Sequence, residues 1–192
     1  MARIGYKKGK YNVIDPTTGN YKAVTDGVPR LEKVIDEKFS PEFNSAELYA
    51  DDAICETDYT FKKGSLTITV ANDDDEKDAE IMGNTIEEGE VTKNLADSAP
   101  YVGYGHIVTK IVNGVRAYKV ECFPRVKFTK VVADAKTRGE SVEFATTSIE
   151  GVVFPLENEL NGMPAGTWER HKTFETEAEA ESYLDSCLTP KA

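Results

Sequence analysis

Alternating apolar and polar residues dominate the chain, and this pattern predicts β-strands over helices. The clearest example runs from Tyr101 to Thr129, where two alternating segments flank Asn113-Gly114. That dipeptide is the strongest short signal for a two-residue hairpin turn. A turn of this kind fixes the register of the whole hairpin, so His106 is expected to lie opposite Glu121.

The second strand of this hairpin is predicted to have one apolar and one polar face. The predicted apolar face comprises Tyr118, Val120, Cys122, Val126 and Phe128, and the opposite face comprises Lys119, Glu121, Arg125 and Lys127, with Phe123 as an exception. One face is therefore expected in the core, and the other in water or against a partner. Pro124 cannot donate a ladder hydrogen bond, which predicts an edge or a bulge there.

Further strands and two helices follow from the same reasoning. Leu66, Ile68 and Val70 alternate with polar residues, and another apolar run extends from about Val142 to Phe154. Residues 74–82 fit one short helix that ends at Gly83-Asn84. Residues 175–189 fit a C-terminal amphipathic helix, because Thr176 and Glu179 form a capping box before apolar positions at helical spacing.

The whole chain, residues 1–192, is predicted to form a single, mostly β domain. We expect a β-sandwich or barrel-like fold with one flanking helix and the C-terminal helix. Residues 36–58 and 86–99 are predicted to be irregular and exposed. The first of these is a long loop with Pro, Asn and Ser, yet Phe39, Phe43, Leu48 and Tyr49 are too apolar for a loop without a partner.

Charge and hydropathy narrow the classes of function. The net charge is −11, from 34 acids and 23 bases, which disfavours a tight nucleic-acid binder. No apolar run approaches the ~18 residues needed to span a bilayer. The basic first residues lack the apolar stretch of a secretory signal, so the protein is expected to fold in the cytoplasm where it is made.

No assembled catalytic or metal site is recognisable. The acids from Asp73 to Glu76 lack the spacing of a calcium loop and suit the start of a helix. His106 and His171 are the two histidines, and His106 is better explained as a cross-strand partner than as a ligand or base. Cys122 and Cys187 fall on apolar faces, which favours buried packing over reactivity.

Several stretches resemble segments of siphophage major tail proteins of the phi-thirteen-like family. The first is Glu47-Leu48-Tyr49-Ala50-Asp51-Asp52. Matches in the same order are Gly64 to Val70 with the acidic helix ending in Ile81-Met82-Gly83, then Ala99 to Gly105, and finally Glu143 to Thr146 leading into Ile149-Glu150-Gly151. Together they span about Ile4 to Phe174.

The resemblance implies a structural subunit of a phage tail tube, with no catalysis and no cofactor. It implies stacked, hexameric rings around a lumen through which the genome leaves, other tail proteins such as tape measure, tip and terminator as partners, and no membrane. The protein would reside in the virion tail after assembly in the bacterial cytoplasm. Candidate inter-subunit contacts are Phe39, Phe43, Leu48, Tyr49, Asp51 and Asp52.

Two alternatives and one electrostatic expectation accompany this interpretation. A monomeric β-sandwich carbohydrate-binding module would use surface aromatic residues and would not form rings. A tube protein of a contractile injection machine would share the subunit fold but would have a sheath partner. If a tube forms, its lumen is expected to carry net negative potential, because DNA must pass without being held.

Overall fold

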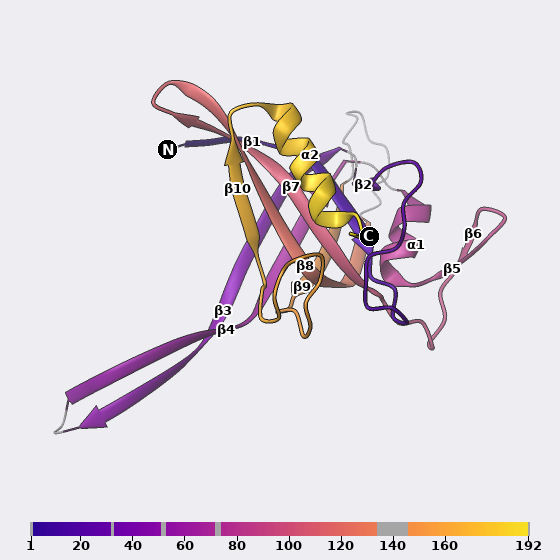
Figure 1. Ribbon diagram of the computed structural model, residues 1–192. Coiled ribbons are helices and arrows are strands. Elements are labelled where there is room, and N and C mark those ends of the chain that lie inside the picture. Colours follow the sequence, from indigo (N-terminus) through magenta and orange to yellow (C-terminus); the bar gives the residue numbers. More distant parts are fainter. Residues whose placement is uncertain (1, 32, 51–52, 72–73, 134–145, 192) are drawn as a thin grey trace, which may run out of the picture.

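The protein folds around one large, curled β-sheet (Figure 1). The computed structural model describes residues 2–31, 33–50, 53–71, 74–133 and 146–191. In chain order the elements are β1 (Ala2–Val13), β2 (Arg30–Leu31), β3 (Val34–Ala50), β4 (Ala53–Val70), α1 (Asp75–Met82), β5 (Thr85–Glu87), β6 (Glu90–Thr92), β7 (Tyr101–Val112), β8 (Val115–Ala133), β9 (Thr147–Val153), β10 (Arg170–Phe174) and α2 (Glu177–Leu188).

The main sheet has the strand order β2-β1-β7-β8-β9-β4-β3, and β10 pairs with β8 beside this path. All its pairings are antiparallel. The predicted class, mostly β with a flanking and a C-terminal helix, is confirmed. Neither helix in the described part of the chain has the length and apolar character needed to cross a membrane.

The predicted hairpin register of β7 and β8 is confirmed. Val112 lies opposite Val115, and His106 lies opposite Glu121. The Asn113-Gly114 turn has positive φ at both residues, 51° and 82°, as a type I′ turn requires.

The predicted faces of β8 are wrong beyond Pro124, where the register shifts. Tyr104 pairs with Phe123 but Val102 pairs with Val126, which is the bulge expected at the proline. One extra residue exchanges the two faces of a strand. Phe123, Val126 and Phe128 therefore share one core, whereas Tyr118, Val120 and Cys122 face the opposite side of the sheet.

The first core lies inside the curl of the sheet. Strands that are far apart in the sheet order contribute to it, among them β1 with Tyr11, β4 with Ile68 and β9 with Ile149, all at most 1% exposed. A flat sheet could not bring these side chains together, so the sheet wraps around them. Helix α1 adds its buried Ile81 to the same core.

The second core lies between α2 and the outer face of β7 and β8 (Figure 1). Leu184 and Leu188 of α2 are fully buried there, beside Ile107 and Val120 of the sheet. Thr176 caps the helix as predicted, because the Glu179 backbone N–H donates to Thr176 Oγ1 over 3.3 Å. The Glu179 carboxylate accepts a 2.8 Å hydrogen bond from the Thr176 hydroxyl.

Ion pairs tie α2 to β1 as well. Three acids one helical turn apart, Glu177, Glu181 and Asp185, face lysines of the strand. Lys7 Nζ lies 2.7 Å from Glu177 Oε2, and Lys10 Nζ lies 2.5 Å from Asp185 Oδ1. The i, i+4 spacing of the acids places them on one side of the helix.

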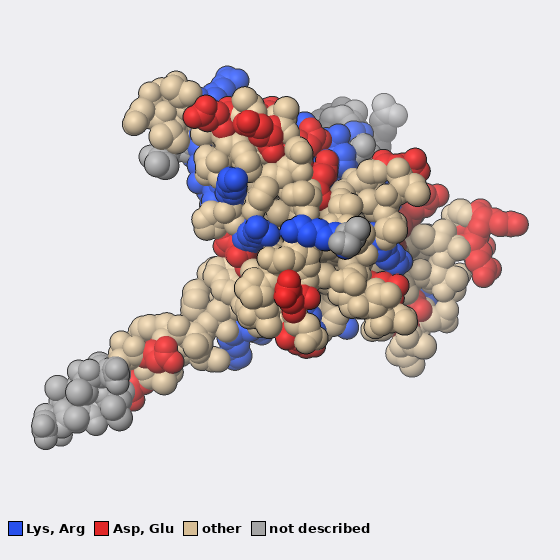
Figure 2. Space-filling view, in the orientation of Figure 1, with Lys and Arg blue, Asp and Glu red and all other residues tan. Residues whose placement is uncertain are grey.

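The other predicted helix is confirmed, and one predicted loop is only partly irregular. Helix α1 has Asp74 as its N-cap and Gly83 in the left-handed conformation at its C-cap. Within residues 86–99, β5 and β6 form a small separate hairpin. Exposed acids at its turn account for the red tip beside β5 and β6 in Figure 2.

The prediction of an irregular loop over residues 36–58 is wrong. This segment belongs to an antiparallel hairpin in which β3 pairs with β4 from Val34–Val70 to Ala50–Ala53. Its loop-like residues, including Pro41, are tolerated because β3 is the last strand of the sheet, where a missing N–H costs little. From Ser40 to Glu47 every described side chain is exposed, which also removes the need for apolar alternation in this part of the strand.

Candidate functional site

The most distinctive feature of the surface is the outer part of the β3–β4 hairpin, which projects far from the body (Figure 1). Strand β4 pairs with β9 only from Gly64 to Val70. The remainder of β4, from Ala53 to Lys63, pairs with β3 alone among the described strands. At about 3.3 Å per residue, this part extends roughly 30 Å or more beyond the ladder with β9.

The projecting part has an aromatic face and a polar face. Phe43 pairs with Phe61 and Ser45 pairs with Tyr59, so these residues share one face, while Asn44 and Thr60 form a pair on the other. Phe43 is 50% exposed and Tyr59 is 63% exposed.

The structure separates the predicted contact residues. Phe39 is half-buried and packs on the first core. Phe43 is exposed on the projecting part. Leu48 and Tyr49 belong to the outer end of β3, and the structure describes their backbone but not their side chains. Asp51 and Asp52 lie outside the described residues.

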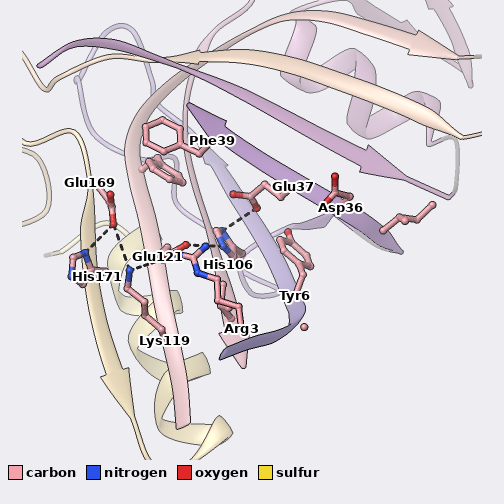
Figure 3. A pocket seen from close by; sticks show the side chains of 14 residues that line it. Arg3, Tyr6, Asp36, Glu37, Phe39, His106, Lys119, Glu121, Glu169 and His171 are labelled. Atoms are coloured by element: carbon pink, nitrogen blue, oxygen red, sulfur yellow. Dashed lines mark hydrogen bonds and ion pairs between the residues drawn. The ribbon is translucent and has the colours of Figure 1, made fainter. Parts of the chain in front are cut away.

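A cavity of about 590 Å³ opens at the root of this hairpin (Figure 3). Strands β1, β3, β7, β8 and β10 all contribute to its lining. Its charged and histidine side chains are Arg3, Asp36, Glu37, His106, Lys119, Glu121, Glu169 and His171. The cavity thus lies where β3, at one end of the sheet, curls back towards β1 and β7.

His106 lies between two buried carboxylates. Its Nδ1 is 3.1 Å from Glu37 Oε2, and its Nε2 is 3.3 Å from Glu121 Oε2. The side chains of His106, Glu37 and Glu121 are 3%, 7% and 8% exposed. The Nδ1 contact lies outside hydrogen-bond geometry. Tyr6 stacks on the imidazole with centroids 5.0 Å apart.

Glu121 is the best-compensated acid of the cavity. Arg3 Nη2 donates to its Oε1 over 2.8 Å, and Lys119 Nζ donates to the same oxygen over 2.5 Å. Burial raises the pKa of Glu121, but hydrogen bonds from His106 and Lys119 outweigh it and hold this pKa at about 2, below the usual 4.5. Glu121 is therefore ionised at neutral pH.

Glu37 is compensated less well. The Tyr104 hydroxyl donates to Glu37 Oε2 over 2.7 Å, and Tyr6 and Tyr104 share a 2.7 Å hydrogen bond. Burial nevertheless raises the pKa of Glu37 more than His106 and Tyr104 lower it. Burial also raises the pKa of Tyr104, which keeps its hydroxyl available as a donor.

The sequence predicted one pair of this cluster, His106 opposite Glu121, but none of its other contacts. The hairpin register correctly placed His106 opposite Glu121, but Glu121 was assigned to a wet face and is 6% exposed. Glu37 fell in the segment predicted to be a loop. No local signal marks it, because Asp36, Glu37 and Lys38 are three consecutive charged residues without alternation.

The chemistry of the cluster suits holding strands together. Among the described residues, no group of three or more His, Cys, Asp and Glu side chains could hold a metal ion. The two carboxylates contact opposite nitrogens of one imidazole, so the three cannot converge on one ion. Cys122 and Cys187 are free thiols buried in the second core, away from this cavity.

Comparison with known proteins does not assign a family. No protein-family model matches the chain, and no curated protein matches it. Among solved structures, the chain is similar to the anti-feeding prophage cap, the tube-terminating cap of AFP, with a TM-score of 0.48 and 8% sequence identity. The match covers 91% of this chain and 93% of that chain. That likeness is too low to support an argument about function.

Proposed function

We propose that this chain is a structural subunit of a phage tail tube that assembles with copies of itself into stacked rings. The projecting β3–β4 hairpin carries the proposal. A two-stranded hairpin alone is marginally stable in water, and this one exposes Phe43 and Tyr59 beyond the body of its own domain. A neighbouring subunit would bury these side chains and stabilise the extended conformation.

The open edge of the sheet supports the same proposal. Strand β3 is the last strand in the order of the main sheet, and one of its edges pairs with no other described strand. Such an edge joins readily to a strand of another chain. Because the hairpin and the body are different surfaces, a contact between the hairpin of one subunit and the body of the next is head-to-tail. Repeated contacts of that kind form a ring when the rotation between subunits closes.

Six subunits per ring, the long-tailed phage, and the tape-measure, tip and terminator partners enter the proposal through the sequence resemblance. A ring of six would carry 6 × −11 = −66 charges. A negative inner wall would let DNA pass without tight contacts. In such a tube the chain has a geometric role and needs neither a cofactor nor a catalytic group.

The double substitution Phe43→Ser with Tyr59→Ser tests the role of the aromatic face. Both side chains are exposed in the single subunit, so we expect the fold to persist and the thermal midpoint to shift little. Growth of assemblies, followed by light scattering against protein concentration, should fall at least tenfold because the apolar contact with the neighbour is lost.

The matched control is Asn44→Ser with Thr60→Ser, a cross-strand pair on the polar face of the same hairpin. It should assemble like the unaltered protein. Normal growth of the Phe43/Tyr59 variant would show that the aromatic face is not an assembly contact.

A further inference from the structure

A stack of aromatic rings connects the projecting hairpin to the body. Phe61 of β4 lies face to face with Trp168, with centroids 4.3 Å apart and 9° between the planes. Trp168 stacks in turn on Phe39 at 5.9 Å, and Phe39 packs on Phe123 of β8 at 4.7 Å. The rings form a continuous path from the hairpin to the first core.

The stack lies at the point where the hairpin loses its strand pairing with the rest of the sheet. The ladder between β4 and β9 ends at Gly64. Immediately beyond it, the register of β3 and β4 shifts between the pairs Glu42–Lys63 and Phe43–Phe61. A bulge of this kind bends a strand and increases its twist. The direction of the outer hairpin therefore depends on side-chain packing at this point.

Trp168 is held on a well-anchored segment. The Leu156 backbone N–H donates to Thr167 O over 2.9 Å, and the Gly166 N–H donates to Leu156 O over 2.8 Å. Two residues after the tryptophan, Arg170 enters β10 and pairs with Cys122 of β8. The indole thus belongs to the body, while its partner Phe61 belongs to the hairpin.

We propose that Trp168 is a positioning residue that fixes the direction in which the β3–β4 hairpin leaves the sheet. The indole braces Phe61 on one side, and Phe39 connects the indole to the core. Close packing at Gly64 supports this bracing, because a Cβ there would lie 2.3 Å from the Phe39 ring. The ring and the backbone are in contact with no space for a side chain between them.

The consequence for assembly rests on the proposed function. In a closed ring, each subunit must present its hairpin at the angle that the symmetry requires. A hairpin that pivots at its root would lose that angle, and its ordering would then oppose assembly. The fixed direction itself is a property of the single subunit and is testable without assembly.

The test measures the distance from the hairpin to the body in the full chain. Nitroxide labels are placed at Ser45→Cys on the hairpin and Ala178→Cys on α2, in a Cys55→Ser background. Mass spectrometry confirms two labels per chain, because Cys122 and Cys187 are buried. Pulsed electron–electron resonance is recorded at a protein concentration below the onset of light scattering.

With Trp168 present we expect a narrow distance distribution. Trp168→Ala should at least double its width, and Trp168→Phe, which keeps a stacking ring, should largely preserve it. Phe61→Ala removes the same contact from the hairpin side and should broaden the distribution similarly, even if Trp168→Ala does not fold. Unchanged widths in a folded Trp168→Ala or Phe61→Ala variant would overturn the proposal, whatever the unaltered protein does in assembly.

Discussion

Replacing Glu121 with glutamine is expected to destabilise the protein strongly, whereas the same replacement at Glu37 is not. Glu121 has a pKa of about 2 instead of 4.5, a difference that corresponds to about 3 kcal/mol of stability at neutral pH. Glutamine would remove the counter-charge of Arg3 and would leave Lys119 with Glu169, 4.0 Å away, as its carboxylate partner. We expect Glu121→Gln to lower the free energy of unfolding by about 2–3 kcal/mol at pH 7.

Glu37→Gln should not lower the free energy of unfolding, because burial raises the pKa of Glu37 and its charge is costly in the folded state. A glutamine oxygen can still accept the hydrogen bond from the Tyr104 hydroxyl. At pH 7 we expect this variant to be as stable as the unaltered protein or more stable. The two variants carry the same chemical change, Glu to Gln, at two positions of one cluster.

The two acids also predict pH dependences of opposite sign. The folded-state pKa of Glu121 is depressed, so its contribution is present above 4.5 and is lost as pH falls towards 2. The folded-state pKa of Glu37 is raised, so stability from that site is present below its unfolded pKa and is lost as pH rises through the folded one. Urea unfolding from pH 7 to pH 3 measures both. Equal losses for the two variants at pH 7 would contradict this account of the cavity.

Excision of the outer hairpin should abolish assembly with little effect on the stability of the subunit. The variant replaces residues 44–60 by Asn-Gly and thereby joins Phe43 to Phe61, which already pair across the hairpin. The described part of the removed segment is exposed on both strands, so the cores stay intact. We expect a change of no more than about 1 kcal/mol in the free energy of unfolding.

Chemical unfolding and light scattering on the same preparation separate the two effects. A folded variant that remains monomeric at concentrations where the unaltered protein assembles is the expected result. Assembly at an unchanged rate would show that the hairpin has no part in it. A large loss of stability would show that the outer hairpin supports its own domain.

The parts of the fold that depend on local signals were predictable. The Asn113-Gly114 turn fixed a long register, Gly83-Asn84 marked the end of α1, and Thr176 with Glu179 marked the start of α2. Pro124 predicted an edge or a bulge, and a bulge there exchanges the faces of all later residues of β8. Alternation alone therefore assigned Val126 and Phe128 to the wrong side of the sheet.

The cavity was not predictable, because it depends on how the whole sheet curls. Glu37 meets Tyr104 across 67 residues of sequence, and nothing near either residue indicates the contact. The hairpin was missed for a different reason. Pro41, Asn44 and Ser45 favour loops by propensity, but an edge strand surrounded by water accepts them.

Electron microscopy of the purified, unaltered protein over a range of concentrations tests the central claim most directly. The proposed function predicts hollow rings or tubes of repeating subunits, either spontaneously or after addition of a tail-tip initiator. Their wall should contain the β3–β4 hairpin packed against a neighbouring subunit. Single, unassociated particles at every concentration, with and without the initiator, would contradict the claim.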